Sequence, residues 1–129
     1  MSVSILVVDD EPDVALLFRQ QFRREIRDGT YVMHVANSGE MALEQLSQGI
    51  EPELIVILSD INMPGMDGLQ LLEAIKQRFP DIPVMMVTAY GDDERRTRAA
   101  RYGASEFVTK PVDFDTLKER LRQLPSGSR

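Results

Sequence analysis

The chain has 129 residues, of which 43% are hydrophobic and 28% charged, a composition typical of one globular domain that excludes a disordered or fibrous protein. It contains no Cys, which excludes a disulfide scaffold, thiolate metal ligands and thiol catalysis. The net charge of −6 repels a phosphate backbone, so direct binding to nucleic acid is not expected. No apolar run is long enough to span a bilayer or resembles a secretion signal. We therefore expect a cytoplasmic protein with no membrane partner.

Short apolar runs alternate with amphipathic stretches along the whole chain. A continuous apolar run is typical of a strand buried on both faces, whereas apolar residues at every third or fourth position predict a helix. The predicted strands cover residues 4–8, 31–36, 54–58, 84–88 and 106–109. The helical stripes run from Val14 to Ile26, from Met41 to Leu46, from Leu71 to Phe79, from Asp92 to Tyr102 and from Phe114 to Leu124. Strict alternation of strands and helices implies a parallel α/β sheet with helices on both faces.

Several residues are suited to begin or end these helices. Asp10 or Glu11 can cap the first helix, where Pro12 fits the first turn. Asn37 or Ser38 can cap the second helix in the same way. These caps place each predicted helix directly after the strand that precedes it.

Charged and polar residues follow the predicted strands at the edge where open parallel sheets bind their ligands. Asp9 and Asp10 follow the first strand, Asp60 follows the third, Thr88 ends the fourth and Lys110 follows the fifth. Three neighbouring carboxylates repel one another unless a cation lies among them. Lys110 is one such cation, and an all-oxygen set of ligands is typical of Mg²⁺.

An Asp beside a divalent cation can attack phosphorus and form an acyl phosphate. Asp60 is the best nucleophile because it stands alone at the end of the middle strand, whereas Asp9 and Asp10 are placed as a metal-holding pair. Lys110 and Thr88 are positioned to neutralise and hydrogen-bond the transferring phosphoryl group.

The chain resembles the response-regulator receiver domains of two-component signalling from about residue 3 to residue 124. The motifs that carry this resemblance are Val7–Pro12, Ser59–Gly68, Val87–Ala89, Gly103–Ala104 and Phe107–Pro111. It implies a flavodoxin-like (βα)5 fold, a doubly wound five-stranded parallel sheet in strand order 2-1-3-4-5. It also implies a receiver domain in residues 1–124. The composition of residues 125–129 predicts a flexible tail or linker. The separation of Asp10 and Asp60 is longer than usual in the family, and we place the extra length at residues 24–30 and 49–54.

The resemblance implies that Asp60 is the phosphoacceptor and that Mg²⁺ is the cofactor, with Mn²⁺ as an alternative ion. Asp10 would bind the ion directly, Asp9 mainly through water, and Asn62 through its backbone carbonyl. Asp60 would be the fourth metal-binding residue. By position, the side chain at residue 62 would also tune the lifetime of the acyl phosphate, together with Tyr90.

The remaining roles implied by the resemblance concern the phosphoryl group and the switch. Lys110, Thr88 and the backbone N–H of Ala89 would bind the phosphoryl group. Thr88 and Phe107 would be the switch pair, with Phe107 turning inward as Thr88 moves toward the phosphoryl group. The Lys110–Pro111 peptide bond is expected to be cis.

The predicted function is that of a phosphorelay switch that catalyses only its own phosphorylation and dephosphorylation. The phosphodonor would be a sensor histidine kinase or a phosphotransfer protein. Phosphorylation would change the face formed by the last two helices and the strand between them, residues 92–124, and so control an output domain or protein. The same face could form a homodimer. The helix from Asp92 to Tyr102 has only Ala99, Ala100 and Tyr102 as apolar anchors, which suits a helix that shifts.

Other interpretations of the same residues remain. A Mg²⁺-dependent aspartyl phosphatase of the haloacid dehalogenase type needs Asp-x-Asp after the first strand, but here that strand is followed by Asp9-Asp10-Glu11-Pro12. A receiver-like interaction module that is never phosphorylated would not need the complete site. Asp9 and Asp10 could simply cap a helix, Phe107 could be an ordinary core residue, and the arginines between residues 95 and 101 could form a solvated surface.

Overall fold

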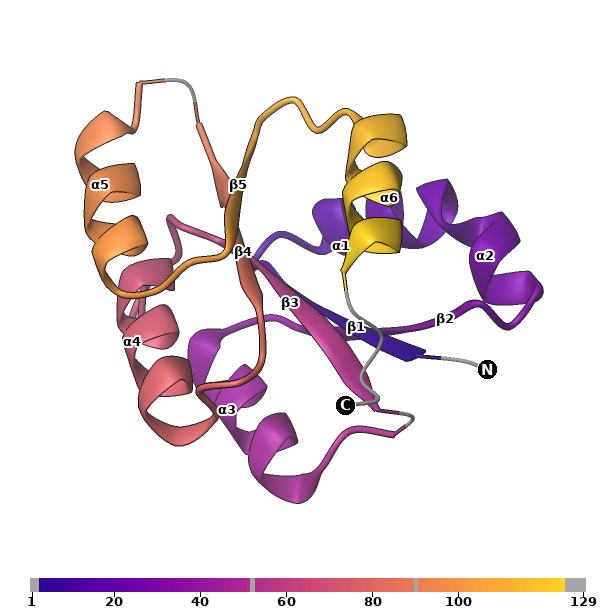
Figure 1. Ribbon diagram of the computed structural model, residues 1–129, viewed down its shortest axis with the longest axis horizontal. Coiled ribbons are helices and arrows are strands. Elements are labelled where there is room, and N and C mark those ends of the chain that lie inside the picture. The colour runs from indigo at the N-terminus through magenta and orange to yellow at the C-terminus, as the bar shows by residue number, and fades with distance from the viewer. Residues whose placement is uncertain (1–2, 52, 90, 125–129) are drawn as a thin grey trace.

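The computed structural model describes residues 3–51, 53–89 and 91–124, which form one sheet with helices on both sides (Figure 1). The strands are β1 (Val3–Val8), β2 (Tyr31–Ala36), β3 (Leu54–Asp60), β4 (Val84–Thr88) and β5 (Glu106–Thr109). The helices are α1 (Pro12–Gln21), α2 (Arg23–Arg27), α3 (Gly39–Gln48), α4 (Gly68–Arg78), α5 (Asp93–Arg101) and α6 (Phe114–Gln123). All neighbouring strands are parallel, and their order, β2-β1-β3-β4-β5, confirms the predicted one.

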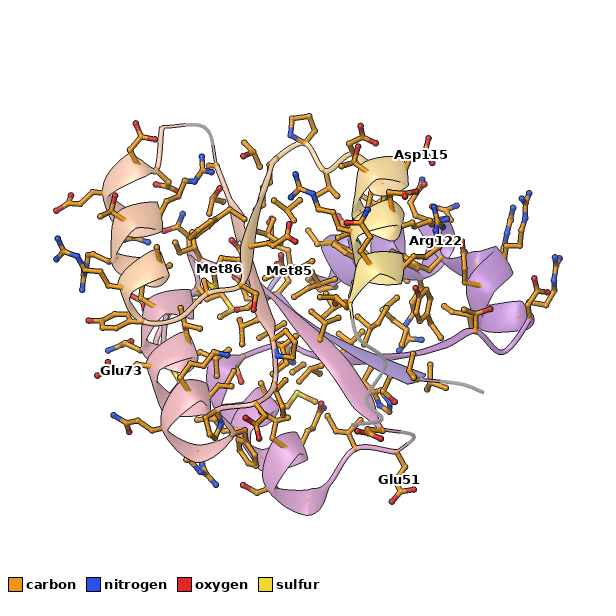
Figure 2. All side chains as sticks on the ribbon, viewed as in Figure 1. Glu51, Glu73, Met85, Met86, Asp115 and Arg122 are labelled. Carbon is orange, nitrogen blue, oxygen red and sulfur yellow. The ribbon has the colours of Figure 1, made fainter. Side chains whose placement is uncertain are left out.

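The sheet separates two apolar layers, because successive side chains of a strand point to opposite faces. On β4, Met86 packs with side chains of α3, α4 and α5, whereas Met85 packs with those of α1 and α6. Figure 2 labels these two methionines, which lie on either side of β4 near the centre of the molecule. Both are fully buried, as the unbroken apolar sequence of this strand predicts.

The strand order places the ends of β1 and β3, where the candidate site lies, at a topological switch point. After β1 the chain crosses to β2 on one side, and it then returns to pair β3 with the other side of β1. The carboxyl ends of β1 and β3 are therefore neighbours with connections that lead in opposite directions, which leaves a crevice between them. The register pairs Val8 with Ser59, so the residues that follow, Asp9 and Asp60, come out at the same level.

The first helical stretch differs from the single helix that the sequence predicts. It is divided at Phe22, whose backbone has φ −99° and ψ 13°, into α1 and the short helix α2. The amides of Phe22 and Ile26 still donate to the carbonyls four residues earlier, at 3.0 and 2.9 Å. The apolar spacing therefore continues across the division, and part of the extra length predicted at residues 24–30 is helical.

Some predicted core and capping residues have other environments. Leu17 and Met41 lie in the predicted apolar stripes but are 42% and 39% exposed. Ala100 is also exposed, which leaves Ala99 as the buried residue of α5. Ser38 caps α3 by accepting from the amide of Met41, as predicted, whereas Glu11 occupies the cap position of α1 without a side-chain hydrogen bond. Among the residues described, no helix is long and apolar enough to cross a membrane.

Candidate functional site

Three carboxylates meet at the carboxyl ends of β1 and β3. Asp9, Asp10 and Asp60 each contribute one oxygen to a group in which all oxygens lie within 4.8 Å of one another. Asp9 and Asp60 are buried, at 4% and 5% exposure, and Asp10 is half-buried. The predicted convergence of these residues is confirmed, and it concentrates negative charge where little water can screen it.

Backbone hydrogen bonds fix the two buried carboxylates. The amide of Asp9 donates to the carbonyl of Ala36 on β2 at 3.1 Å, and its carboxylate accepts from the amide of Glu11 at 2.9 Å. On β3, the Oδ1 atom of Asp60 accepts from the amide of Asn62 at 3.2 Å. Each carboxylate is therefore held by the amide two residues later, which turns the chain away from its strand and leaves the acidic group at the end of the sheet.

A cation from the fifth strand reaches the cluster. The Nζ atom of Lys110 lies 3.4 Å from Oδ2 of Asp60. The backbone of Lys110 is fixed because its amide donates to the carbonyl of Thr88 at 2.8 Å, which extends the pairing of β4 and β5 by one residue. The Lys110–Pro111 bond is cis, as expected. Asp60 thus lies close both to the two acidic residues that follow β1 and to the ammonium group of Lys110.

Thr88 brings a free hydroxyl to the same edge of the sheet. Its side chain is fully buried, and Oγ1 has no hydrogen-bond partner within the described part of the chain. A buried hydroxyl is usually paired, because leaving it unpaired costs the free energy of its lost hydration. An unpaired hydroxyl at the end of β4 is therefore available to a group that enters the site.

Burial has a strong effect on Asp9. Burial is the main cause of a rise in the pKa of the Asp9 carboxyl from 3.8 to about 6, and the neighbouring charges of Asp60 and Asp10 contribute to this rise. The hydrogen bond from the amide of Glu11 and the charge of Lys110 oppose this shift. The Asp9 carboxyl is therefore difficult to ionise unless a cation lies nearby. The three carboxylates together provide the all-oxygen surroundings that Mg²⁺ prefers.

An apolar cavity of about 300 Å³ adjoins this site. Asp60 and Lys110 line it together with residues of β1, α1 and the segment before α6, most of which are apolar. Leu17, which is half exposed, belongs to the wall formed by α1. The Asp60–Lys110 pair can therefore be approached from the side of the sheet that α1 and α6 cover.

Other predicted residues lie near the acidic cluster with partners of their own. The amide of Ala89, expected to face a phosphoryl group, donates to Oδ2 of Asp92 at 3.4 Å. The side chain of Asn62 donates to the same Asp92 oxygen at 3.2 Å, and its amide oxygen accepts from Arg95. Tyr90 lies outside the described residues, so its predicted role in tuning the acyl phosphate stays a prediction.

Two members of this network, Asp92 and Arg95, were not among the predicted site residues. In the sequence, Asp92 has the pattern of an acidic helix start, and Arg95 belongs to a series of arginines that predicts a solvated surface. Neither pattern indicates a contact with Asn62, which is distant in the sequence. Only the closeness of Asn62 and Asp92 to the ends of neighbouring strands, β3 and β4, could have suggested it.

Comparison with protein families gives a match over nearly the whole chain. The family described as "Response regulator receiver domain" matches residues 5–122. The chain is 36% identical over 132 residues to the Response regulator protein FleR of Pseudomonas aeruginosa, with 98% of this chain and 26% of FleR covered. It is 35% identical over 122 residues to the Transcriptional regulatory protein ZraR of Escherichia coli, with 95% of this chain and 26% of ZraR covered.

The structure is also similar to solved structures. One is the response regulator protein TrrA from Thermotoga maritima in complex with Mg²⁺-BeF, with a TM-score of 0.79 and 33% sequence identity. The alignment covers 95% of this chain and 98% of TrrA. In contrast, the chain spans about a quarter of the length of the curated relatives FleR and ZraR.

Proposed function

The chain belongs to the family of response regulator receiver domains, and from this premise we propose that Asp60 accepts a phosphoryl group and so switches the domain between two states. The observation that carries the proposal is the set of partners around Asp60. Its carboxylate lies within 4.8 Å of oxygens of Asp9 and Asp10 and 3.4 Å from Nζ of Lys110. Thr88, whose hydroxyl has no hydrogen-bond partner among the described residues, ends the neighbouring strand β4. As a receiver domain, the chain is a signalling switch rather than a classical enzyme.

The reaction is a phosphoryl transfer to a carboxylate. One carboxylate oxygen of Asp60 forms a bond to phosphorus while the bond between phosphorus and an imidazole nitrogen of the donor breaks, and the electron pair leaves with the imidazole. Water later attacks the same phosphorus and returns the free carboxylate and inorganic phosphate. Lys110 neutralises part of the negative charge that spreads over the phosphoryl oxygens, and the hydroxyl of Thr88 donates a hydrogen bond to one of them.

The acidic cluster fits a divalent cation, for which Mg²⁺ is the first candidate. The carboxylates of Asp9, Asp10 and Asp60 and the backbone carbonyl of Asn62 would hold it, with Mn²⁺ as an alternative ion. When bound, it supplies positive charge that lowers the repulsion between the attacking carboxylate and the phosphoryl oxygens. The bound Mg²⁺-BeF of the similar TrrA structure supports this choice of ion.

Thr88 and Phe107 are proposed to transmit the change. The ring of Phe107 is half-buried beneath Arg96 of α5, whose guanidinium carbon lies 5.2 Å from the ring centre. The carbonyl of Phe107 accepts from Arg120 of α6 at 3.1 Å. A movement of Phe107 would therefore change its contacts with both α5 and α6. Of these two helices, α5 should shift easily, because little of its surface is buried against the core. We propose that the face formed by α5, β5 and α6 controls the output, alone or as a homodimer.

The partners follow from the same proposal. The donor would be a sensor histidine kinase or a phosphotransfer protein. We propose that residues 1–124 form the receiver domain, and that the output is control of transcription through a separate domain or protein. The name of ZraR, a transcriptional regulatory protein much longer than the matched region, supports this output.

The test is intact-mass analysis after incubation with Mg²⁺ and acetyl phosphate. We expect one phosphoryl group on the wild-type chain, and none on Asp60→Asn or in the presence of a chelator. An adduct that persists on Asp60→Asn would mean that another residue is the nucleophile. No adduct on the wild-type chain would favour a receiver-like interaction module, and steady hydrolysis of phosphate esters by Asp60→Asn would favour a phosphatase.

A further inference from the structure

Asp92 forms a closed pair of hydrogen bonds with Ala89 at the start of α5. The amide of Asp92 donates to the carbonyl of Ala89 at 3.3 Å, and the amide of Ala89 donates to Oδ2 of Asp92 at 3.4 Å. The amide of Ala89 immediately follows Thr88, at the end of the strand next to Asp60. The donor that the family resemblance assigns to a phosphoryl oxygen is therefore already paired with a carboxylate of the chain itself.

The same carboxylate connects the segment after β3 with α5. Oδ2 of Asp92 also accepts from the side-chain amide of Asn62 at 3.2 Å, and the side-chain oxygen of Asn62 accepts from Arg95. Asn62 is in turn bound to the acceptor residue, because its backbone amide donates to Oδ1 of Asp60. A continuous series of hydrogen bonds thus runs from Asp60 through Asn62 to the first turn of α5.

Asp92 is placed as a helix cap but does not act as one here. It occupies the N-cap position of α5, yet its side chain accepts no hydrogen bond from that helix. By contrast, Ser38, Asp67 and Asp113 all accept from a backbone amide in the first turn of their helices. An Asp at this position usually accepts from the second or third amide of the helix, which in α5 belong to Glu94 and Arg95. Asp92 therefore has a second set of donors within its own helix.

We infer that Asp92 is a positioning residue with two alternative sets of partners, and this inference rests on the proposed function. Without a phosphoryl group, Asp92 pairs with Ala89 and Asn62, and so ties α5 to the end of β3. With a phosphoryl group on Asp60, that group takes the amide of Ala89. The carboxylate of Asp92 then turns to the amides of Glu94 and Arg95 and caps α5.

Charge gives the reason for the exchange. A phosphoryl group brings about −1.5 to −2 charges at neutral pH, and its oxygens compete with the carboxylate of Asp92 for the same N–H donor. Repulsion removes Asp92 from that donor, and the positive end of the α5 dipole offers it a favourable place. Its departure leaves the side chain of Asn62 with Arg95 alone, so the start of α5 keeps only one of its two side-chain hydrogen bonds to Asn62.

The test is a titration with beryllofluoride, a phosphoryl mimic, in the presence of Mg²⁺, followed by the amide NMR signals of the whole chain. In the wild type, saturation is expected to slow hydrogen exchange at the amides of Glu94 and Arg95. In Asp92→Ala this protection is absent. The midpoint of its titration falls by about threefold to tenfold, because one competing hydrogen bond no longer has to be broken. Asp92→Asn keeps an acceptor without the charge and serves as a second variant if the alanine variant does not fold.

Asp93→Ala is the matched control, since it removes the same charge from the next residue, which is exposed. An equal fall of the midpoint in this variant, or an unchanged midpoint in Asp92→Ala, would overturn the inference. Unchanged exchange at Glu94 and Arg95 in the wild type on saturation would overturn it as well. A wild-type chain that binds no beryllofluoride at all would instead show that the proposed function fails, and the inference with it.

Discussion

Gly68, the first residue of α4, lies so close to Asp60 that a β-carbon on it would fall 2.3 Å from the carbonyl oxygen of Asp60. The same β-carbon would lie 2.6 Å from the α-carbon of Ile61, and both of these atoms belong to the backbone. The amide of Gly68 also donates to the carbonyl of Ile61 at 3.0 Å. The helix and the end of β3 therefore touch directly beside the proposed phosphoacceptor, and only a residue without a side chain permits this contact.

We expect Gly68→Ala to lower the free energy of unfolding by about 1–3 kcal/mol, because the backbone must move to remove the overlap. The same movement should displace Asp60 and slow its phosphorylation. Gly39→Ala is the matched control, since Gly39 is also the first residue of a helix and its added β-carbon would meet only the flexible side chain of Met66. Thermal unfolding of both variants checks the prediction, which fails if the two substitutions have equal effects.

Thr88→Val should slow phosphorylation without lowering the free energy of unfolding. The valine has nearly the same shape, and the hydroxyl it replaces is buried without a partner among the residues described. We expect the free energy of unfolding to stay the same or rise by about 1 kcal/mol, since an unpaired buried hydroxyl is costly. The rate of phosphorylation by acetyl phosphate should fall by about tenfold to a hundredfold, because one hydrogen bond to a charged group is lost.

Thr109→Val is the control for this prediction, because Thr109 is the register partner of Thr88 on β5 but is exposed. It should change neither property. A large loss of stability in Thr88→Val would mean that the hydroxyl has a partner in solution. An unchanged rate would mean that Thr88 does not contact the phosphoryl group.

The fold could be predicted from the sequence because each strand carries its own signal. Residues 84–87 are apolar and Thr88 follows them, and the strand β4 covers residues 84–88, with Met85 and Met86 on opposite faces. The acidic cluster could be predicted for a related reason. The carboxyl ends of parallel strands lie at one edge, so Asp9 and Asp60 come together once β1 and β3 are neighbours, as the strand order of the resembled family implies.

Other features depend on information that the residue pattern does not contain. The division at Phe22 preserves the spacing of four residues between Phe18, Phe22 and Ile26, so periodicity alone cannot detect it. The direction of the Asp92 side chain depends on a competition between donors of its own helix and donors of a distant segment. Such a competition is decided by three-dimensional positions, and an acidic residue before a helix predicts only the local choice.

The raised pKa of Asp9 predicts how the stability of the metal-free chain depends on pH. The folded-state pKa of about 6 exceeds the ordinary value of 3.8, so the folded chain binds the proton more tightly than the unfolded chain. The stability that this proton contributes is fully present below pH 3.8 and is lost as the pH rises through 6. The difference between the two pKa values corresponds to about 3 kcal/mol.

We therefore expect Asp9→Asn and the wild type, both with a chelator, to differ little in stability near pH 4. The variant should become the more stable of the two as the pH rises to 7, by about 3 kcal/mol. Addition of Mg²⁺ should stabilise the wild type more than the variant. Chemical denaturation across this pH range is the measurement, with Asp28→Asn as an exposed control. A stability difference between Asp9→Asn and the wild type that does not change with pH would show that ionised Asp9 is not costly in the folded chain.

Lys118 of α6 should contribute more to stability than the surface ion pair beside it. Its Nζ atom donates to the carbonyl of Gln21 at 2.7 Å, lies 3.1 Å from Glu25, and stands 5.2 Å from the ring centre of Phe22. It therefore holds α6 against the division between α1 and α2. The side chains of Lys118 and Glu25 are only 19% and 23% exposed, so little water can replace either partner.

We expect Lys118→Met to lower the free energy of unfolding by about 1–3 kcal/mol, because the carboxylate of Glu25 stays half-buried without its cation. Arg122→Met is the control. Arg122 and Glu119 form a shorter pair, at 2.7 Å, but both side chains are 61% exposed, so we expect a change of about 0.5 kcal/mol or less. Urea unfolding measures both effects. The double variant Lys118→Met/Glu25→Gln then decides the cause: if it recovers most of the loss, the cost is the unpaired carboxylate. If it recovers none, the bond to the Gln21 carbonyl and the contact with the Phe22 ring account for the stability.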